Sequence, residues 1–506
     1  MTRSIIRLAL VVGVALALVV PASATAQRDR DPGDRRVAPF FLRHVAADTW
    51  RGFAAMTYPN GLTADNMSAS GIRSGYTSPT NIGAYLWSSL AARDMGIIKP
   101  REARARIAKT LETLSRMERH DDSGMYYNWY DPATGQKLTV WPVDGGTVYP
   151  FLSSVDNGWL ASALIMAGDA VPRLRAEAGR IFQDMDLGFF HDPGAGLLRG
   201  GFWVDPPPDC SVLDNYRERG ADVYYTCHHY GALNTEPRIA SYIAIAYNGV
   251  PATHYFKMWR TLPQTCDWGW HEMKPEGVTR TYLGVEVFEG HYTYRGMDIV
   301  PSWGGSMFEA LMVPLLVPEE EWGPRSWGVN HPLYVRGQIE HGLQEAEYGY
   351  WGFSPSNDPA GGYREYGVDP MGLNPDGYTS DQERTTVDYG FGECRPPGET
   401  DPDYGRGVVT PHASFLALDH ADRAAIANLL NLVRDFDAYG DFGFYDAIDV
   451  VTGDVSRYYL ALDQGMIMVA IANELRNDRL QHYFVRGGIR EAIRPLLAME
   501  EFTAGE

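Results

Sequence analysis

A chain of 506 residues is long enough for two or three average domains or for one large single core. Its formal net charge of −20 argues against nucleic acid or an anionic lipid surface as a partner, because both would be repelled at long range. A neutral or cationic substrate suits this charge better. Four cysteines, Cys210, Cys227, Cys266 and Cys394, could form two disulfides, and the sequence does not choose among the pairings.

The amino-terminal segment has the organisation of a secretory signal. A basic start precedes an apolar run over residues 8–20 and a small-residue cleavage site that ends at Ala26. The run is shorter than the roughly 20 apolar residues of a membrane-spanning helix, and no second candidate span follows. We expect export to the periplasm or the exterior, with a signal peptide over residues 1–26, a disordered linker over 27–36 and a single domain over 37–506.

The rest of the chain is predicted to form successive helices, because it shows little of the alternation of apolar and polar residues that is typical of strands. The first three are expected at 40–54, 80–95 and 100–119. Nearly all-apolar helices are then expected at 157–167, 238–247, 408–418 and 464–475, alternating with more polar ones at 172–186, 335–345, 421–436 and 480–496. A helix that is apolar all round is buried, whereas an amphipathic one covers a surface. The alternation therefore predicts an all-α fold with two concentric rings of helices, a toroid.

Two long insertions interrupt this alternation, at residues 188–222 and 354–406. They are rich in Gly, Pro, Asp and Tyr. Loops of this length without secondary structure are uncommon in compact domains unless they are functional or disordered. Since both carry many aromatic residues, we expect them to form walls or lids around a cleft.

Several familiar catalytic signatures are absent from the sequence. There is no G-x-S-x-G elbow, no phosphate-binding G-x-x-x-x-G-K-[ST] loop, no H-E-x-x-H and no paired C-x-x-C. The segment Cys227-His228-His229 offers metal-binding side chains, but adjacent histidines point apart and no matching cluster follows at ligand spacing. We therefore expect no metal and no cofactor.

The remaining candidates are acids in apolar or aromatic surroundings: Asp156, Glu236, Glu309, Asp446, Asp449 and Asp463. Hydrolysis of a glycosidic bond needs two carboxyl groups, one protonated to assist the leaving oxygen and one ionised to activate water or to attack. Glu236 stands at the start of an apolar helix, where partial burial can raise the pKa of a carboxyl toward the acid role.

Each acid also has a structural interpretation. Glu236 would occupy a first helical turn, where the helix dipole stabilises a carboxylate and lowers its pKa. Asp156 and Asp463 each stand before an apolar helix and could be N-caps. Glu309 could be a buried acid that bonds a neighbouring helix. Spacing alone leaves these alternatives open.

Longer motifs resemble a known family, in the same order along most of the chain. They include SSVDNGWLASALI (153–165), EPRIASYIAIAYNGVP (236–251), SWGGSMFEALM (302–312), YGYWGFSPSNDP (348–359) and FGFYDAIDV (442–450). The chain resembles the glucoamylase-like domain at the end of cyclic β-1,2-glucan synthases and the endo-β-1,2-glucanases of glycoside hydrolase family 144. The resemblance implies an (α/α)6 barrel with a glucan lying across its mouth.

The resemblance also implies residue roles. Glu236 matches the general acid, with Arg238 as an orienting partner, and Asp446 matches the general base, acting on water directly or through a relay. Asp449 is a rival base in the same motif, and Asp156 and Glu309 are further alternatives for catalysis. The candidates for the sugar-binding lining are Asn81, Asp156, Arg238, Trp303, Glu309, Trp351, Tyr445 and Asp463.

One departure from the family pattern bears on mechanism. The synthase domain has a Ser-Glu-Ser after its Trp-Gly pair, whereas this chain reads WGFSPSND, with Pro355 in place of the glutamate. Without that carboxylate a covalent glycosyl-enzyme is hard to build, so we expect hydrolysis with inversion, which needs carboxyl groups about 6.5 to 9.5 Å apart.

Other functions remain open from the sequence. The same fold could act on another polysaccharide, because the two insertions are the parts that the resemblance covers least. A polysaccharide lyase would require an anionic sugar as its substrate, and the negative charge of the chain disfavours such a substrate. A catalytically inactive glycan-binding protein is a third possibility. Oligomeric state and endo or exo action are not indicated.

Overall fold

The structure, a computed structural model, describes residues 34–262, 264–266, 273–373, 393–394, 396 and 404–506. The expected signal peptide and residues 27–33 of the expected linker lie outside the described residues. The last linker residues already belong to helix α2 (Asp34–Met56). Within the described ranges, no helix is both long enough and apolar enough to cross a membrane.

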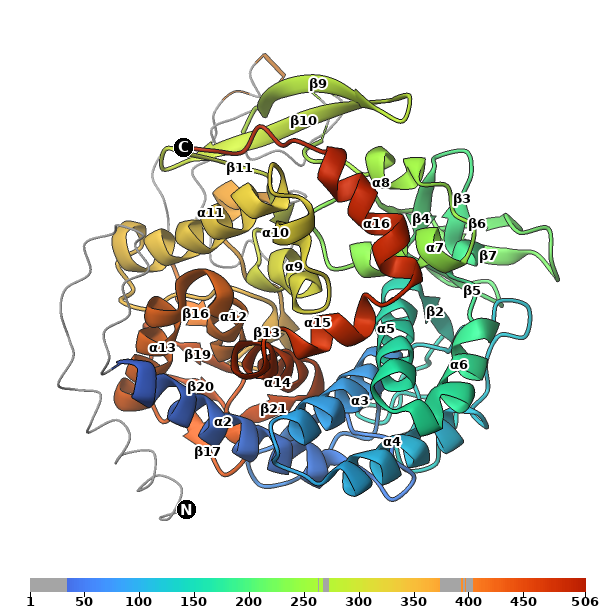
Figure 1. The fold of residues 1–506 in the computed structure, drawn as a ribbon, viewed down its shortest axis with the longest axis horizontal. Coiled ribbons are helices and arrows are strands. Elements are labelled where there is room, and N and C mark those ends of the chain that lie inside the picture. Colours follow the sequence, from blue (N-terminus) through green and yellow to red (C-terminus); the bar gives the residue numbers. More distant parts are fainter. Residues whose placement is uncertain (1–33, 263, 267–272, 374–392, 395, 397–403) are drawn as a thin grey trace.

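Six helices form the interior of the molecule (Figure 1). They are α3 (Pro79–Asp94), α5 (Ser154–Ala170), α7 (Arg238–Tyr247), α9 (Met307–Leu311), α12 (Pro411–Leu416) and α14 (Ala461–Arg476). α14 packs on α3, α3 on α5, α5 on α7, α9 on α12 and α12 on α14. Hydrogen bonds from Arg238 of α7 to the backbone of α9 join the remaining pair. Most side chains of α3, α5 and α14 are buried, as their apolar sequences predict.

A second set of helices covers this interior. α2 packs on α3 and α14, and the others each pack on one inner helix: α4 (Pro100–Leu114) on α3, α6 (Arg175–Asp184) on α5, α16 (Gly488–Met499) on α7, α11 (Trp327–Glu340) on α9 and α13 (Leu418–Asp435) on α12. The single helix expected at 480–496 is two, α15 (Arg479–Phe484) and α16, because the chain turns at Gly487 with a φ of 70°. Short helices α8 (Thr253–Lys257) and α10 (Glu319–Trp322) complete the set.

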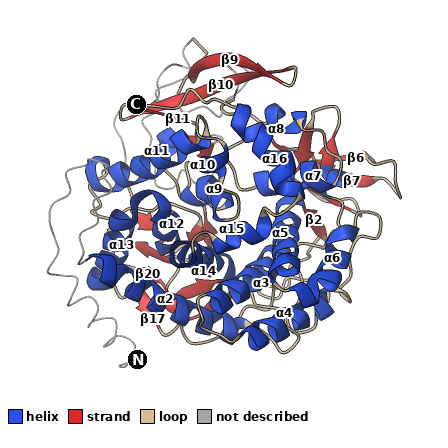
Figure 2. Cartoon of the chain, viewed as in Figure 1, coloured by secondary structure: helices blue, strands red, loops and turns tan. Residues whose placement is uncertain are grey.

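Small sheets lie mainly around the helices, so the all-α expectation is corrected to a helix-rich fold with sheets (Figure 2). Most of these strands are two to four residues long, which leaves too little alternation to recognise in sequence. The larger sheets are β2-β5-β7-β6 (Phe151–Ser153, Gly201–Trp203, Val223–Thr226, Ser211–Asp214) and β11-β10-β9 (Met297–Ile299, Val285–Tyr294, Glu276–Tyr282). Strands β5 and β6 of the first sheet come from the insertion at 188–222.

The remaining strands form two- and three-stranded sheets. They are β1-β21 (Asn66–Ser68, Tyr458–Leu460), β3-β4-β8 (His191–Asp192, Leu197–Arg199, His229–Tyr230), β12-β15 (Ser302–Trp303, Gly372–Leu373), β13-β14 (Ser356–Asn357, Tyr363–Arg364), β16-β19-β20 (Val408–Val409, Ala447–Asp449, Val455–Ser456) and β17-β18 (Tyr439–Gly440, Gly443–Phe444). The hairpin β13-β14 belongs to the insertion at 354–406, of which residues 374–392, 395 and 397–403 lie outside the described part.

Close contacts between inner helices depend on glycine. A Cβ added to Gly158 of α5 would lie 2.8 Å from the Cβ of Ala240 on α7, and one added to Gly465 of α14 would lie 2.8 Å from the Cβ of Ala84 on α3. Carbon atoms in contact normally lie about 3.5 to 4.0 Å apart. These helices can approach so closely only because the glycines lack a side chain.

We expect Gly158→Ala to lower the free energy of unfolding by about 1 to 3 kcal/mol, because the added methyl group must push α5 and α7 apart. Equilibrium unfolding in urea measures this loss. Gly179→Ala in α6 is the matched control, since a Cβ there meets no atom within 4 Å, and it should leave stability unchanged or raise it by up to about 1 kcal/mol. Equal stability of the two variants would contradict the close contact.

Candidate active site

Three inner helices converge on Glu236. This residue lies just before α7, which begins at Arg238, and not in its first turn as expected. Its carboxylate accepts a hydrogen bond from the indole N–H of Trp159 on α5. Its backbone N–H donates to Oε2 of Glu309 at 2.8 Å. Glu309 belongs to the first turn of α9, is partly buried, and bonds the segment before α7 and not a neighbouring helix as expected.

Burial raises the pKa of Glu236 well above the usual range. The neighbouring acid Glu309 raises it further, while the hydrogen bond from Trp159 opposes the rise. Burial also raises the pKa of Glu309 to about 8. The effect of burial thus outweighs any stabilisation of the carboxylate by the helix dipole. A raised pKa favours the protonated form of a carboxyl, which is the form that a general acid needs.

Arg238 holds the chain around Glu236 in place. Its guanidinium makes a bidentate ion pair with Glu319 at 2.9 Å. It also donates to the carbonyl oxygens of Thr235, Glu309 and Ala310. Both side chains of the Arg238–Glu319 pair are 0% exposed. Arg238 is therefore inaccessible to a sugar in this structure, and its role is to position Glu236 and Glu309.

A second carboxyl pair lies at Asp446, between β18 and β19. Burial raises the pKa of Asp446 to about 6, and a hydrogen bond from Asp463 together with one from the backbone N–H of Asn357, at 2.6 Å, limits the rise. Burial and the charge of Asp446 raise the pKa of Asp463 well above the usual range. These surroundings favour the ionised form of Asp446 and the protonated form of Asp463.

Asp463 is not the N-cap that its sequence position suggested, because no side chain caps the start of α14. The N-cap of α5 is likewise Ser153, not Asp156. Asp156 instead accepts a hydrogen bond from the hydroxyl of Thr80 at 2.6 Å. Both aspartates are thus free of the capping role that would explain them as purely local structure.

The rival acid Asp449 has a different environment. Its Oδ2 accepts a hydrogen bond from Nε of Arg406 at 2.8 Å. Its Oδ1 accepts from the backbone N–H groups of Val451 and Thr452, both at 3.1 Å. A carboxylate with both oxygens engaged in this way closes a turn, and the arrangement favours Asp446 as the base.

Asp65 interacts electrostatically with acids from both groups, the one around Glu236 and the one around Asp446. Its sequence context did not single it out. Burial raises its pKa, and the charge of Asp156 adds to this, while hydrogen bonds from Asn81 and Asn66 oppose it. The Asn81 amide donates to Asp65 at 2.6 Å. The charge of Asp65 in turn raises the pKa of Asp446 and of Asp463. The acids therefore form one electrostatic unit.

Tyr363, on the hairpin β13-β14, interacts with both sides of this unit. Loss of hydration raises the pKa of its hydroxyl well above the usual range, and the negative charges of Asp463, Asp446, Glu365 and Glu236 raise it further. Its side chain is nevertheless 52% exposed. We interpret this as a hydroxyl directed toward the acids and a ring that remains open to solvent. Part of the insertion at 354–406 thus reaches the site, as expected for a wall.

The aromatic candidates differ in accessibility. Trp303 in β12 is partly exposed. Trp351 is 1% exposed and Tyr445 is 7% exposed. Trp351 is held by Asn428 of α13 through its backbone, and Tyr445 packs on Tyr459. Trp351 is therefore a core residue, contrary to its expected place in a sugar-binding lining.

Four residues of the site were missed in the sequence: Asp65, Trp159, Asn357 and Tyr363. Trp159 lies inside a quoted motif, but only the fold shows that its indole N–H reaches Glu236. Asn357 acts through its backbone, which no sequence pattern reports. Tyr363 lies in the two-residue strand β14, which is too short for an alternation that sequence could reveal.

The cysteines form two disulfides, Cys210–Cys227 and Cys266–Cys394. The first pairing removes Cys227 from any metal site at Cys227-His228-His229. Nε2 of His229 donates a hydrogen bond to Oδ2 of Asp192, 2.9 Å away, and Arg199 also pairs with this carboxylate. This segment is therefore part of a structural hydrogen-bond network.

Comparison with solved structures shows a glucoamylase-like, helix-rich fold. An endo-β-1,2-glucanase from Chitinophaga pinensis, in complex with sophorotriose and glucose, superposes with a TM-score of 0.61 at 17% identity, covering 91% of this chain and 98% of that one. A β-1,2-glucanase from Parabacteroides distasonis gives 0.63 at 16% identity, with 94% and 61% covered. A putative glucoamylase from Bacteroides uniformis gives 0.62 at 16% identity, with 93% and 98% covered.

Residues 229–487, about half of the chain, match the family described as "Putative glucoamylase", and the chain belongs to that family. Residues 44–192 match a second family, described as a protein of unknown function (DUF3131). The cyclic β-(1,2)-glucan synthase NdvB of Rhizobium meliloti is 24% identical over 581 aligned residues, which cover 90% of this chain. This chain spans only 18% of the length of that synthase.

We expect Glu319→Gln to lower the free energy of unfolding by about 3 to 5 kcal/mol, because it leaves the buried Arg238 guanidinium without a counter-charge. Thermal or urea unfolding measures this. Glu102→Gln is the matched control, since its ion pair with Arg106 at 3.0 Å is partly exposed and contributes little. A Glu319→Gln protein as stable as the control would show that Arg238 does not depend on this partner.

Proposed function

We propose that the protein is a glycoside hydrolase that cleaves a glucan with inversion, with Glu236 as general acid and Asp446 as general base. The observation that carries the proposal is the pair of carboxyls, Glu236 and Asp446, whose charges both raise the pKa of Tyr363 and whose surroundings differ, with burial raising the pKa of Glu236 well above the usual range and hydrogen bonds limiting the rise at Asp446. Hydrolysis of a glycosidic bond needs one carboxyl that is protonated and one that is ionised. We interpret the inner helices and the outer helices that cover them as an (α/α)6 barrel. We interpret residues 37–506 as one catalytic domain.

In this mechanism Glu236 transfers its proton to the leaving glycosidic oxygen as the bond to the anomeric carbon breaks. Asp446 removes a proton from the water that attacks the same carbon from the opposite face. Asp463 stabilises the ionised state of Asp446 by donating a hydrogen bond to it. The anomeric configuration inverts, because the water enters opposite the leaving group.

The relatives support a β-1,2-linked glucan as the substrate, since two solved structures of the same fold are β-1,2-glucanases and the curated relative is a cyclic β-(1,2)-glucan synthase. Partly exposed Asp156, Asp65, Trp303 and Tyr363 are the proposed sugar contacts. Two disulfides suit an oxidising compartment, which supports the expected export to the periplasm or the exterior.

The experiment that tests the proposal is incubation of the protein with linear β-1,2-glucan, starch, β-1,3-glucan and mannan. Chromatography follows the products and NMR follows the first anomer released. Short sophorooligosaccharides of inverted configuration from β-1,2-glucan alone are expected. Retained configuration would refute the assigned mechanism, and activity on another polymer would refute the substrate. Binding of glucan without turnover would favour the alternative of an inactive glycan-binding protein.

We expect Glu236→Gln and Asp446→Asn each to lower kcat by about 10²- to 10⁴-fold, because each removes one proton transfer from the transition state. Steady-state kinetics on β-1,2-glucan measures this, and calorimetric binding of the substrate should persist.

Asp449→Asn is the matched control for Asp446→Asn. It should lower thermal stability through the lost Arg406 pair and leave kcat of the remaining folded enzyme close to that of the unaltered protein. A larger loss of kcat in Asp449→Asn than in Asp446→Asn would reverse the assignment of the base.

The pH dependence of kcat/KM should be bell-shaped. Asp446 must be ionised, so activity falls as the pH drops below its pKa of about 6, by about tenfold per unit. Glu236 must be protonated, and its raised pKa keeps it so at neutral pH. Initial rates at constant ionic strength measure the profile. Undiminished activity well below pH 6, where Asp446 would be neutral, would contradict its role as base.

A further inference from the structure

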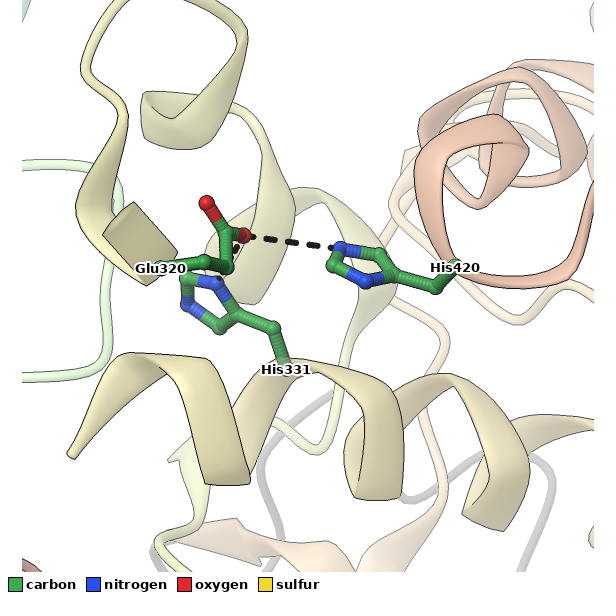
Figure 3. A group of neighbouring side chains, drawn as sticks. All are labelled: Glu320, His331 and His420. Atoms are coloured by element: carbon green, nitrogen blue, oxygen red, sulfur yellow. Dashed lines mark hydrogen bonds and ion pairs between the residues drawn. The ribbon is translucent and has the colours of Figure 1, made fainter. Parts of the chain in front are cut away.

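A compact group of metal-binding side chains lies outside the proposed active site. Glu320 of α10, His331 of α11 and His420 of α13 direct their polar atoms toward one point between three helices (Figure 3). The ligand atoms of the three residues all lie within 4.8 Å of one another. Oε1 of Glu320 is 2.6 Å from Nδ1 of His331 and 3.5 Å from Nε2 of His420.

These distances suit coordination of a small cation. Zinc binds imidazole nitrogen and carboxylate oxygen at about 2.0 to 2.2 Å, which places tetrahedral ligand atoms roughly 3.3 Å apart. Displacements of about an ångström would therefore bring all three atoms to that separation. A neutral imidazole offers one ring nitrogen with a lone pair to a metal ion.

The surroundings of the group also favour a cation. Nε2 of His331 is buried without a hydrogen-bond partner and lies 3.7 Å from Oε2 of Glu319. A histidine that binds metal through one nitrogen usually donates the other N–H to a carboxylate, and Glu319 stands where that carboxylate would be. Asp419 and Asp478 also lie within electrostatic reach of Glu320. Further carboxyl groups therefore surround the three side chains.

Access for an ion is available on the side of the carboxylate. The side chain of Glu320 is 30% exposed, whereas those of His331 and His420 are 0% and 9% exposed. All four cysteines are in disulfides, so no thiolate competes for a soft metal. A set of two imidazoles and one carboxylate suits zinc and related divalent transition metals better than calcium or magnesium.

We propose that Glu320, His331 and His420 bind one divalent transition-metal ion, with Zn²⁺ as the best match, and that water completes the tetrahedral shell. The ion ties α10, α11 and α13 together. Because His331 faces Glu319, the bound ion also fixes the carboxylate that pairs with Arg238. The site is structural, and it does not depend on the proposed glucan hydrolysis.

The test uses the full chain without an affinity tag, stripped with EDTA and dialysed. Calorimetric titration with ZnCl₂ should give one ion per chain, and thermal unfolding should shift to higher temperature in the presence of Zn²⁺. Titration with CoCl₂ should produce the visible absorption bands of tetrahedral Co²⁺. These readouts need no glucan, so a failed activity assay would not affect them.

Glu320→Gln and His420→Ala should each weaken Zn²⁺ binding by at least about tenfold and abolish the thermal shift. His482→Ala is the matched control, since this exposed histidine lies near Asp478 in the same acidic neighbourhood but outside the group, and it should bind Zn²⁺ as the unaltered chain does. Circular dichroism of the metal-free variants checks that they fold. Absence of saturable binding, or equal affinity in Glu320→Gln and His420→Ala, overturns the proposal.

Discussion

The buried guanidinium of Arg238 is the constraint on which the proposed acid depends. Its five donors bind one carboxylate, the backbone carbonyl of Thr235 before α7, and two backbone carbonyls of α9. These bonds fix the two chain segments that carry Glu236 and Glu309. A buried charge is costly unless it is paired and fully hydrogen-bonded, so the arrangement has little freedom to shift. The carboxyl of Glu236 is thereby held at a defined place.

The different pKa shifts of the carboxyls depend on their hydrogen-bond partners as well as on burial. Burial raises the pKa of Glu236, of Asp463 and of Asp446 alike. Asp446 accepts hydrogen bonds from the backbone N–H of Asn357 and from Asp463, and both favour its charged form. Local hydrogen bonding thus distinguishes the proposed base from the proposed acid within one acidic neighbourhood.

Sequence reasoning succeeded where the signal was long and periodic. Helices such as α3, α5 and α14 could be predicted, since their apolar residues extend over several turns and leave no polar face. The candidate acids were found because they interrupt such apolar stretches. The strands could not be predicted as well, because segments of two to four residues depend on partners distant in sequence.

The parts of the site that escaped prediction share a physical cause. The indole of Trp159, the carboxyl of Asp65 and the hydroxyl of Tyr363 are defined by contacts between elements far apart in the chain. Arg238 and Trp351 were expected near a sugar, yet both are core residues. A motif identifies a residue as part of a neighbourhood and does not state which way its side chain points.

The contact between Asn357 and Asp446 has a consequence for evolution. The donor is a main-chain amide, so nearly any residue at position 357 would supply it, and only proline lacks it. Mutational drift in the side chains of the hairpin can therefore reshape the surface beside the site while the proposed base keeps its partner. Insertions and deletions, which move the amide itself, are the changes that this part of the chain should tolerate least.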